Sequence, residues 1–194
     1  MPDIRRLNLI LARLDQGGER GFTLIELLVV LLIIGILLAI AIPTFLTVTK
    51  TANNTATQAN LQTALTGADT FYASNNQTYT GLYGGIGVST ITAIDTGLTY
   101  TTGGTTTKAN TISVLTGNSG GWAILAAFAP GTKDCWVIVD IKTTVGAAVT
   151  TSMPATDYSA GTYYGVIRNT AACTPSITEG IAAANWSSTG FPHG

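Results

Sequence analysis

One uninterrupted apolar run constrains this chain more than any other feature. Residues 22–42 read FTLIELLVVLLIIGILLAIAI and contain a single ionisable side chain, Glu26. A helix rises about 1.5 Å per residue, so the run spans roughly 30 Å, the thickness of a bilayer core. Four arginines precede the run and the next basic residue is Lys50. This charge distribution predicts a single-pass membrane helix with its N-terminus in the cytoplasm and the rest of the chain outside.

The segment before the run, residues 1–21, differs from an ordinary secretory signal. Its charged part is long, and no small-x-small cleavage site follows the apolar run. A cut after Gly21 would retain the hydrophobic helix, so we expect residues 1–21 to be a leader that is removed there. Apolar residues recur in the leader at helical spacing among the arginines. This pattern fits a basic amphipathic helix on the inner membrane surface and an unstructured tail equally well.

Glu26 is the one charge inside the run. A carboxylate in the bilayer costs about 2.5–3.5 kcal/mol on insertion scales, and the run contains no Lys, Arg or His to pair with it. Cleavage after Gly21 creates a new α-amine on Phe22, and staggered helices can bring the amine of one chain to the carboxylate of the next. A buried pair of this kind specifies register more than it adds stability. The alternative is a carboxylate near the interface that stays solvated or protonated.

The hexapeptide GFTLIE at residues 21–26, followed by the apolar run, resembles the cleavage and methylation signature of type IV prepilins. The resemblance implies cleavage by a prepilin peptidase between Gly21 and Phe22, and N-methylation of Phe22. It also implies that Glu26 pairs with the amine of a neighbouring subunit during assembly. The similarity is strong from Gly21 to about Pro43 and continues as weaker helical similarity to about Ser74.

The helix is expected to continue well beyond the apolar run. Gly35 and Pro43 match positions where helices of the family weaken or kink, since glycine costs about 1 kcal/mol in a helix interior and proline about 3. Helix-ending residues follow at 74–76, so one helix should extend from Phe22 to about Ala73. Its second half is one-sided and needs a cover. The stripes that we expect to be covered are Ala52, Ala56 and Ala59, and Leu61, Leu65, Ala68 and Tyr72.

The remainder of the chain predicts a small β-rich head. Short β-prone pieces are separated by Gly, Pro, Asp and Ser clusters, and their short spacing favours an antiparallel meander because parallel pairing needs longer crossovers. The end from Thr170 on has turn composition and no expected regular core. The stronger strand signals, which predict the meander, are at 122–128, 136–141, 145–150 and 163–168. Weaker β-prone pieces at 88–94, 98–102 and 111–115 indicate an irregular connection with one or two small strands.

The fold class that follows is α+β, a long N-terminal helix with a small antiparallel sheet packed on its second half. The expected divisions are a leader at 1–21, a transmembrane and polymerisation helix at 22–43, an amphipathic continuation at 44–74 and a globular head at 75–194.

Two cysteines, Cys135 and Cys173, lie in the expected head. An exported chain with two cysteines favours a disulfide over a metal site, which would need more ligands than the lone His193 supplies. Such a bridge would tie the C-terminal region to the sheet and contribute about 3–4 kcal/mol in the chain-entropy model. The alternative is two buried free thiols.

The sequence contains no catalytic constellation. The lone His193 leaves no Ser/His/Asp or Cys/His arrangement, so we expect no enzymatic activity, cofactor or resident metal. Asp134, Asp140 and Asp157 offer oxygen ligands for calcium, but solvated loop carboxylates are the simpler interpretation. The net charge of −1 does not provide the electrostatic footprint that nucleic-acid binding needs.

The resemblance implies a structural subunit of an extracellular type IV pilus filament. Its location would be the cytoplasmic membrane before assembly and the cell surface afterwards. Its partners would be further copies of itself in a helical homopolymer, a prepilin peptidase and the assembly machinery. The alternatives are a pseudopilin of a type II secretion or competence system, a minor pilin, and a membrane-anchored binding module. Intact Glu26 argues against a mere anchor, which has no use for a buried carboxylate.

Overall fold

The computed structural model describes residues 21–84, 90–117, 119–143, 159–175 and 185–192. The chain separates into two compact units, Met1–Phe45 and Leu46–Gly194, and each is described by itself. We call the second of these the head unit. Residues 1–20 of the leader, the expected strand at 145–150 and the first part of the β-prone piece at 88–94 lie outside the described residues, as does His193.

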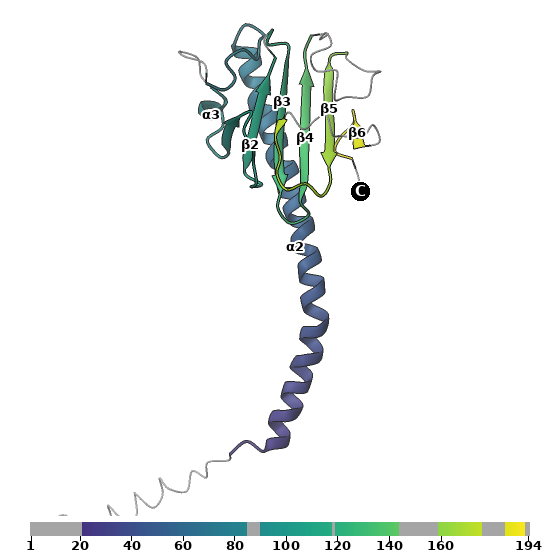
Figure 1. Cartoon of the computed structure of the whole chain (residues 1–194). Coiled ribbons are helices and arrows are strands. Elements are labelled where there is room, and N and C mark those ends of the chain that lie inside the picture. Colours follow the sequence, from purple (N-terminus) through teal and green to yellow (C-terminus); the bar gives the residue numbers. More distant parts are fainter. Residues whose placement is uncertain (1–20, 85–89, 118, 144–158, 176–184, 193–194) are drawn as a thin grey trace, which may run out of the picture. The chain divides into compact units, whose positions relative to one another are not determined.

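One helix, α2 (Leu24–Ser74), contributes to both units (Figure 1). Its bounds confirm the expected helix to within two residues, and it is assigned without a break through Gly35 and Pro43. In the first unit every described residue is exposed, including the large apolar side chains that cover all sides of the helix. In the head unit the helix becomes one-sided, as the sequence pattern predicts.

The buried side of α2 lies between residues 57 and 71 and packs on the sheet. Leu61 and Ala68 are fully buried there and Leu65 and Tyr72 are partly buried, which confirms one expected stripe. The other expected stripe, of alanines, is wrong, because all three of its members are exposed in the structure: Ala52, Ala56 and Ala59. The sheet is therefore covered by the C-terminal turns of the helix.

The helix ends where the polar signals predict. Asn76 and Gln77 adopt left-handed backbone conformations, with φ of 50° and 58°, which the helix cannot continue through. The side-chain amide of Asn75 donates to the carbonyl oxygens of Thr78 at 3.1 Å and Thr80 at 2.9 Å. These contacts turn the chain back towards the sheet.

Six strands form a single sheet in which the spatial order is the sequence order. Every neighbouring pair is antiparallel except the first, which is parallel. The sheet is therefore the expected meander with one added parallel edge. The strands are β1 (Thr99–Thr102), β2 (Thr111–Thr116), β3 (Trp122–Ala129), β4 (Asp134–Ile141), β5 (Gly161–Ile167) and β6 (Trp186–Ser187).

Three local features differ from the expectations. Strands β1 and β2 pair in parallel without a long crossover. Because β1 is only four residues long, the loop after it is long enough to bring the chain back to the end at which β1 starts. The segment Ile91–Ile94, which belongs to a β-prone piece of the sequence, forms the short helix α3. The C-terminal region, expected to lack regular structure, contributes β6 and packs Phe191 edge-on against Trp136 and Tyr164.

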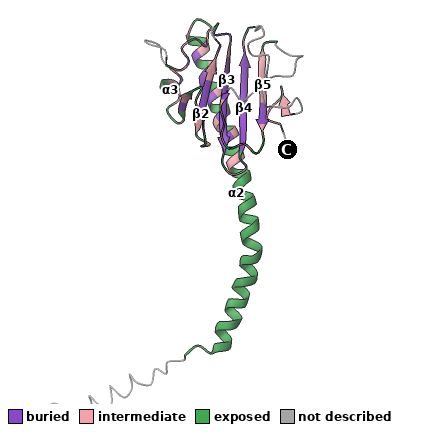
Figure 2. Ribbon diagram, in the orientation of Figure 1, coloured by how far each residue is buried: buried purple, intermediate pink, exposed green. Residues whose placement is uncertain are grey.

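Both faces of the central strands are buried (Figure 2). On β4, Trp136 and Ile138 belong to the cluster that includes α2, whereas Val137 and Val139 belong to a second cluster on the opposite face. A strand buried on both faces reads as a continuous apolar run rather than as an alternation. This explains why 136–141 was recognisable as a strand by composition alone.

Candidate assembly site

The predicted cleavage position lies just outside the helix. Gly21 and Phe22 precede α2 and are exposed, and the Phe22 side chain is 82% exposed. A Cβ added at Gly21 would meet no other atom within 4 Å. The bond between these residues therefore lies outside α2, and no described residue covers it.

Glu26 has a partner within its own chain. Its Oε2 accepts hydrogen bonds from the backbone N–H and the hydroxyl of Thr23, both at 2.8 Å, and its own N–H donates to Thr23 Oγ1 at 3.2 Å. This reciprocal arrangement is a capping box, which satisfies N–H groups that a helix start leaves without acceptors. The apolar run contains no basic residue, and for that reason a partner for Glu26 was predicted in another chain. The T-x-x-E spacing of residues 23–26 was the signal for this closer one.

The helix after this cap carries the apolar surface. The large apolar side chains between Leu24 and Val48 are 45–80% exposed. Within the described residues, α2 is long and apolar enough to cross a membrane, and its most apolar window of 18 residues has a mean hydropathy of 3.2. Glu26 lies in the first turn of this helix, near one end of the span.

The two predicted weak points of the helix do not interrupt it. A Cβ added at Gly35 would meet nothing within 4 Å, so packing inside this chain does not require a glycine there. Thr44, directly after Pro43, donates its hydroxyl to the carbonyl oxygen of Ile40 at 3.0 Å. The predicted kinking at Gly35 and Pro43 stays a prediction.

The structure contains the expected disulfide between Cys135 and Cys173. Both residues are fully buried, Cys135 at the start of β4 and Cys173 in the C-terminal region. The backbone of Cys173 also exchanges hydrogen bonds with Thr106, at 2.7 and 3.0 Å. The bridge therefore ties the C-terminal region to β4 and, through Thr106, to the loop between β1 and β2.

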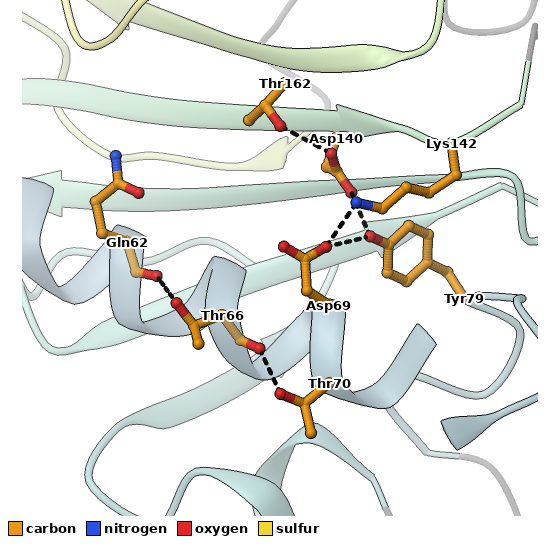
Figure 3. Close-up of polar contacts among 8 residues, drawn as sticks. All are labelled: Gln62, Thr66, Asp69, Thr70, Tyr79, Asp140, Lys142 and Thr162. Carbon is orange, nitrogen blue, oxygen red and sulfur yellow. Dashed lines mark hydrogen bonds and ion pairs between the residues drawn. The ribbon is translucent and has the colours of Figure 1, made fainter. Parts of the chain in front are cut away.

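A polar cluster that sequence reasoning missed links α2 to the sheet (Figure 3). Lys142 Nζ lies 2.7 Å from Asp69 Oδ1 and 3.0 Å from Asp140 Oδ2. The Tyr79 hydroxyl donates to both carboxylates, and the Thr162 hydroxyl donates to Asp140 Oδ1 at 3.0 Å. Because these residues come from four separate segments, only the folded chain brings them together.

The electrostatics of this cluster favour a charged lysine and a neutral tyrosine. Burial and the hydrogen bond to Asp140 raise the pKa of Tyr79 well above its ordinary value of 10.0. Burial acts to lower the pKa of Lys142, but its hydrogen bonds to Asp69 and Asp140 outweigh burial and raise that pKa. The cluster is therefore an ion-pair network that fixes the last turns of α2 on the sheet.

The structure corrects the reading of the aspartates. Asp134 and Asp140 lie at opposite ends of β4 and are only 4% and 2% exposed, so they are neither solvated loop carboxylates nor neighbours. Asp157 lies outside the described residues. Among the residues that the structure describes, no group of three or more His, Cys, Asp or Glu side chains is placed to hold a metal ion.

Comparison with known families gives one match. Residues 17–42 match the family described as the prokaryotic N-terminal methylation motif, and the match covers the predicted cleavage position, Glu26 and the apolar run. Comparisons with curated proteins and with solved structures found no match. The motif implies processing by a prepilin peptidase. The chain thus carries the N-terminal methylation motif of type IV prepilin-like proteins, followed by a pilin-like α+β fold.

Proposed function

We propose that the mature chain is the structural subunit of an extracellular type IV pilus filament. The observation that carries this proposal is the match at residues 17–42, which coincides with a wholly exposed apolar helix and its single carboxylate. In the proposed organisation, residues 1–21 are removed, 22–43 cross the membrane and later polymerise, 44–74 continue the helix, and 75–194 form the head.

The exposed apolar helix requires a cover, and the described residues do not provide one. Transferring apolar surface out of water is the main favourable term in association, and lipid provides such an environment before assembly. Packing against the helices of other subunits provides an equivalent environment afterwards. The same surface therefore serves both states, and extraction from the bilayer exchanges lipid contacts for protein contacts.

Cleavage and Glu26 act together in the proposed assembly. The capping box keeps the carboxylate hydrogen-bonded while the subunit waits in the membrane. Removal of the leader creates the amine of Phe22, and the amine of a neighbouring subunit then pairs with Glu26. An unpaired charge in an apolar core is strongly unfavourable, so subunits that enter in the wrong register are rejected.

Electron microscopy of wild-type and deletion cells, with mass spectrometry of sheared surface material, tests the proposal. Long filaments that contain this chain, and that disappear on deletion, are the expected result. A pseudopilin carries the same N-terminal features, and it would be processed without forming long surface filaments. A chain that is scarce in sheared filaments would be a minor pilin.

A further inference from the structure

Beyond residue 21 the chain has only five basic side chains. Three of them, Lys50, Lys133 and Arg168, gather at one end of the head unit, and we call these three the basic rim. Lys50 lies on α2 four residues after the unit begins at Leu46, Lys133 directly precedes β4, and Arg168 directly follows β5. They come from three separate segments, so the grouping is a property of the fold.

Strand register and contacts place these residues at the same end. The last residue of β5 pairs with Cys135, the second residue of β4, so Lys133 and Arg168 lie just beyond the same end of the sheet (Figure 1). A Cβ added at Gly131, in the turn between β3 and β4, would lie 3.1 Å from the Cα of Lys50. The turn therefore touches α2 beside Lys50.

Among the residues that the structure describes, the exposed side chains at this end carry net positive charge. All three side chains of the basic rim are exposed. The acidic side chain described beside them is Asp134, which is only 4% exposed and has its Oδ2 3.9 Å from Arg168 Nη1. A shallow hollow of about 420 Å³ adjoins the rim, and its lining combines an amine with other polar and apolar groups: Phe128, Pro130, Lys133, Asn169, Thr170 and Ala171.

The two remaining basic residues are placed differently. Lys142 is held by Asp69 and Asp140 in the polar cluster. Lys108 is exposed and precedes β2 at the same end of the sheet as Lys133 and Arg168. It lies at a different level along α2, because the neighbouring carbonyl of Ala109 accepts a hydrogen bond from Asn60 at 2.9 Å. Asn60 follows Lys50 by ten residues on α2, which corresponds to roughly 15 Å along a helix. Lys108 therefore provides a matched control within the same chain.

We propose that the basic rim binds the headgroups of anionic phospholipids at the outer surface of the cytoplasmic membrane while the subunit awaits assembly. The apolar segment is covalently continuous with this end of the head unit through Phe45 and Leu46. The rim thus lies within a few residues of the predicted membrane span, and phosphate oxygens are natural acceptors for ammonium and guanidinium groups. The inference rests on the proposed membrane insertion and not on filament formation.

The contact has a consequence for assembly. Each basic residue close to an anionic surface strengthens binding by about five-fold. Extraction of a subunit must break these contacts together with the lipid contacts of the helix. The anionic lipid content of the membrane would then set how firmly the unassembled head is held against the bilayer.

The test uses the full chain reconstituted in vesicles of phosphatidylcholine alone or of phosphatidylcholine with phosphatidylglycerol. An amine-acetylating reagent labels the outside, and mass spectrometry reports the rate at each lysine. Lys50 and Lys133 should react about five-fold more slowly in the anionic vesicles, and high salt should abolish the difference. Lys108 should react at the same rate in both. The double variant Lys133→Gln/Arg168→Gln should reduce the protection of Lys50, whereas Lys108→Gln should not.

Several results would overturn the proposal. Equal acetylation rates of Lys50 and Lys133 in the two vesicle types, or equal protection of Lys108, would show that the basic rim does not bind anionic headgroups. Protection produced by inorganic phosphate in phosphatidylcholine vesicles would identify a soluble anion as the ligand instead. Filament formation is scored separately in cells, so either idea can fail while the other stands.

Discussion

Thr23 and Glu26 occupy the start of α2, where the first backbone N–H groups lack intrahelical acceptors. In the proposed assembly the carboxylate therefore has two separable tasks, capping its own helix in the free subunit and pairing with an amine in the filament. Either glutamate or glutamine can occupy the third helical position of a capping box and accept the hydrogen bond from the N-cap backbone N–H. The amide of glutamine lacks the charge, so substitution at this residue can separate the two tasks.

We expect Glu26→Gln to leave a stable, membrane-inserted and processed subunit that forms few or no filaments. The variant retains the cap and removes an expensive charge from the apolar run, so insertion should be equal or better. Membrane-fraction abundance and sheared filaments are compared with those of the wild type. The control is Thr23→Ala, which weakens the cap by about 1 kcal/mol but keeps the charge, and it should still assemble. Normal filaments in Glu26→Gln with none in Thr23→Ala would show that capping alone matters.

Ionisation of Tyr79 should make the free energy of unfolding depend on pH in the alkaline range. Its pKa is raised in the folded chain, so a tyrosine in the unfolded chain, with a pKa near 10, ionises first. The free energy of unfolding should therefore fall as the pH rises above about 10. The raised pKa of Lys142 acts in the same direction, because its stabilising charge is lost as the pH rises through the folded pKa.

Thermal unfolding of the full chain in detergent between neutral and alkaline pH checks this expectation. Tyr79→Phe should be less stable at neutral pH, since a hydroxyl that bonds Asp69 and Asp140 is gone, and its stability should fall less steeply with pH. Tyr100→Phe is a useful comparison, because burial and Asp95 also raise the pKa of Tyr100. An unchanged slope in both variants would contradict the assignment.

At the scale of elements, the parts that follow local patterns were predictable. The apolar run and the polar stop at 74–76 define α2, and the composition of 122–128 and 136–141 identifies two buried strands. The parallel β1–β2 pair, α3 and β6 were not predictable, because elements of two to six residues depend on the pairings that the rest of the fold offers.

The candidate sites also divide into one that follows a local sequence pattern and two that form only in the folded chain. Residues 21–26 form a local motif that can be recognised directly in the sequence. Its T-x-x-E spacing also indicates a capping box within the chain, but only a contact with a neighbouring chain was predicted for Glu26. The cluster around Lys142 joins Asp69 and Asp140, which are distant in sequence and meet only through packing of α2 on β4. The basic rim could not be predicted from the sequence either, because its residues come together only through the register of the strands.

The disulfide should contribute substantially to the stability of the head. It closes a separation of 38 residues, which is worth about 4 kcal/mol in the chain-entropy model. The double variant Cys135→Ala/Cys173→Ala should lose roughly that amount in urea unfolding and expose the C-terminal region to proteases. Peptide mapping without reductant should find the linked pair in the wild type. Quantitative alkylation of both thiols in the native protein would contradict the bridge.

At the scale of the whole molecule, the two units have different requirements. The head unit has its own apolar core, an ion-pair network and a disulfide, so we expect it to fold independently of what precedes Leu46. In the described part of the first unit, residues 21–45, every residue is exposed, so we expect its apolar surface to need a membrane or other chains as a cover. Folding and assembly should therefore be separable by changes at the processing position.

The last prediction makes this separation at Gly21. A bulky replacement such as Gly21→Val should prevent cleavage, because a peptidase site that accepts glycine would have to accommodate the added side chain. The precursor should remain in the membrane with its head folded and its disulfide formed. Filaments should be absent, since the retained leader keeps its arginines in the cytoplasm and no amine is created at Phe22.

Mass spectrometry and filament yield together decide this case. The wild-type chain should begin at a methylated Phe22, and Gly21→Val should retain the mass of residues 1–21. If the amine and Glu26 act as a pair, adding Glu26→Gln to Gly21→Val should change nothing further, because each single change already removes one partner of the same contact. Filaments built from uncleaved precursor would show that register does not need the Phe22 amine, and the paired role of Glu26 would then be wrong.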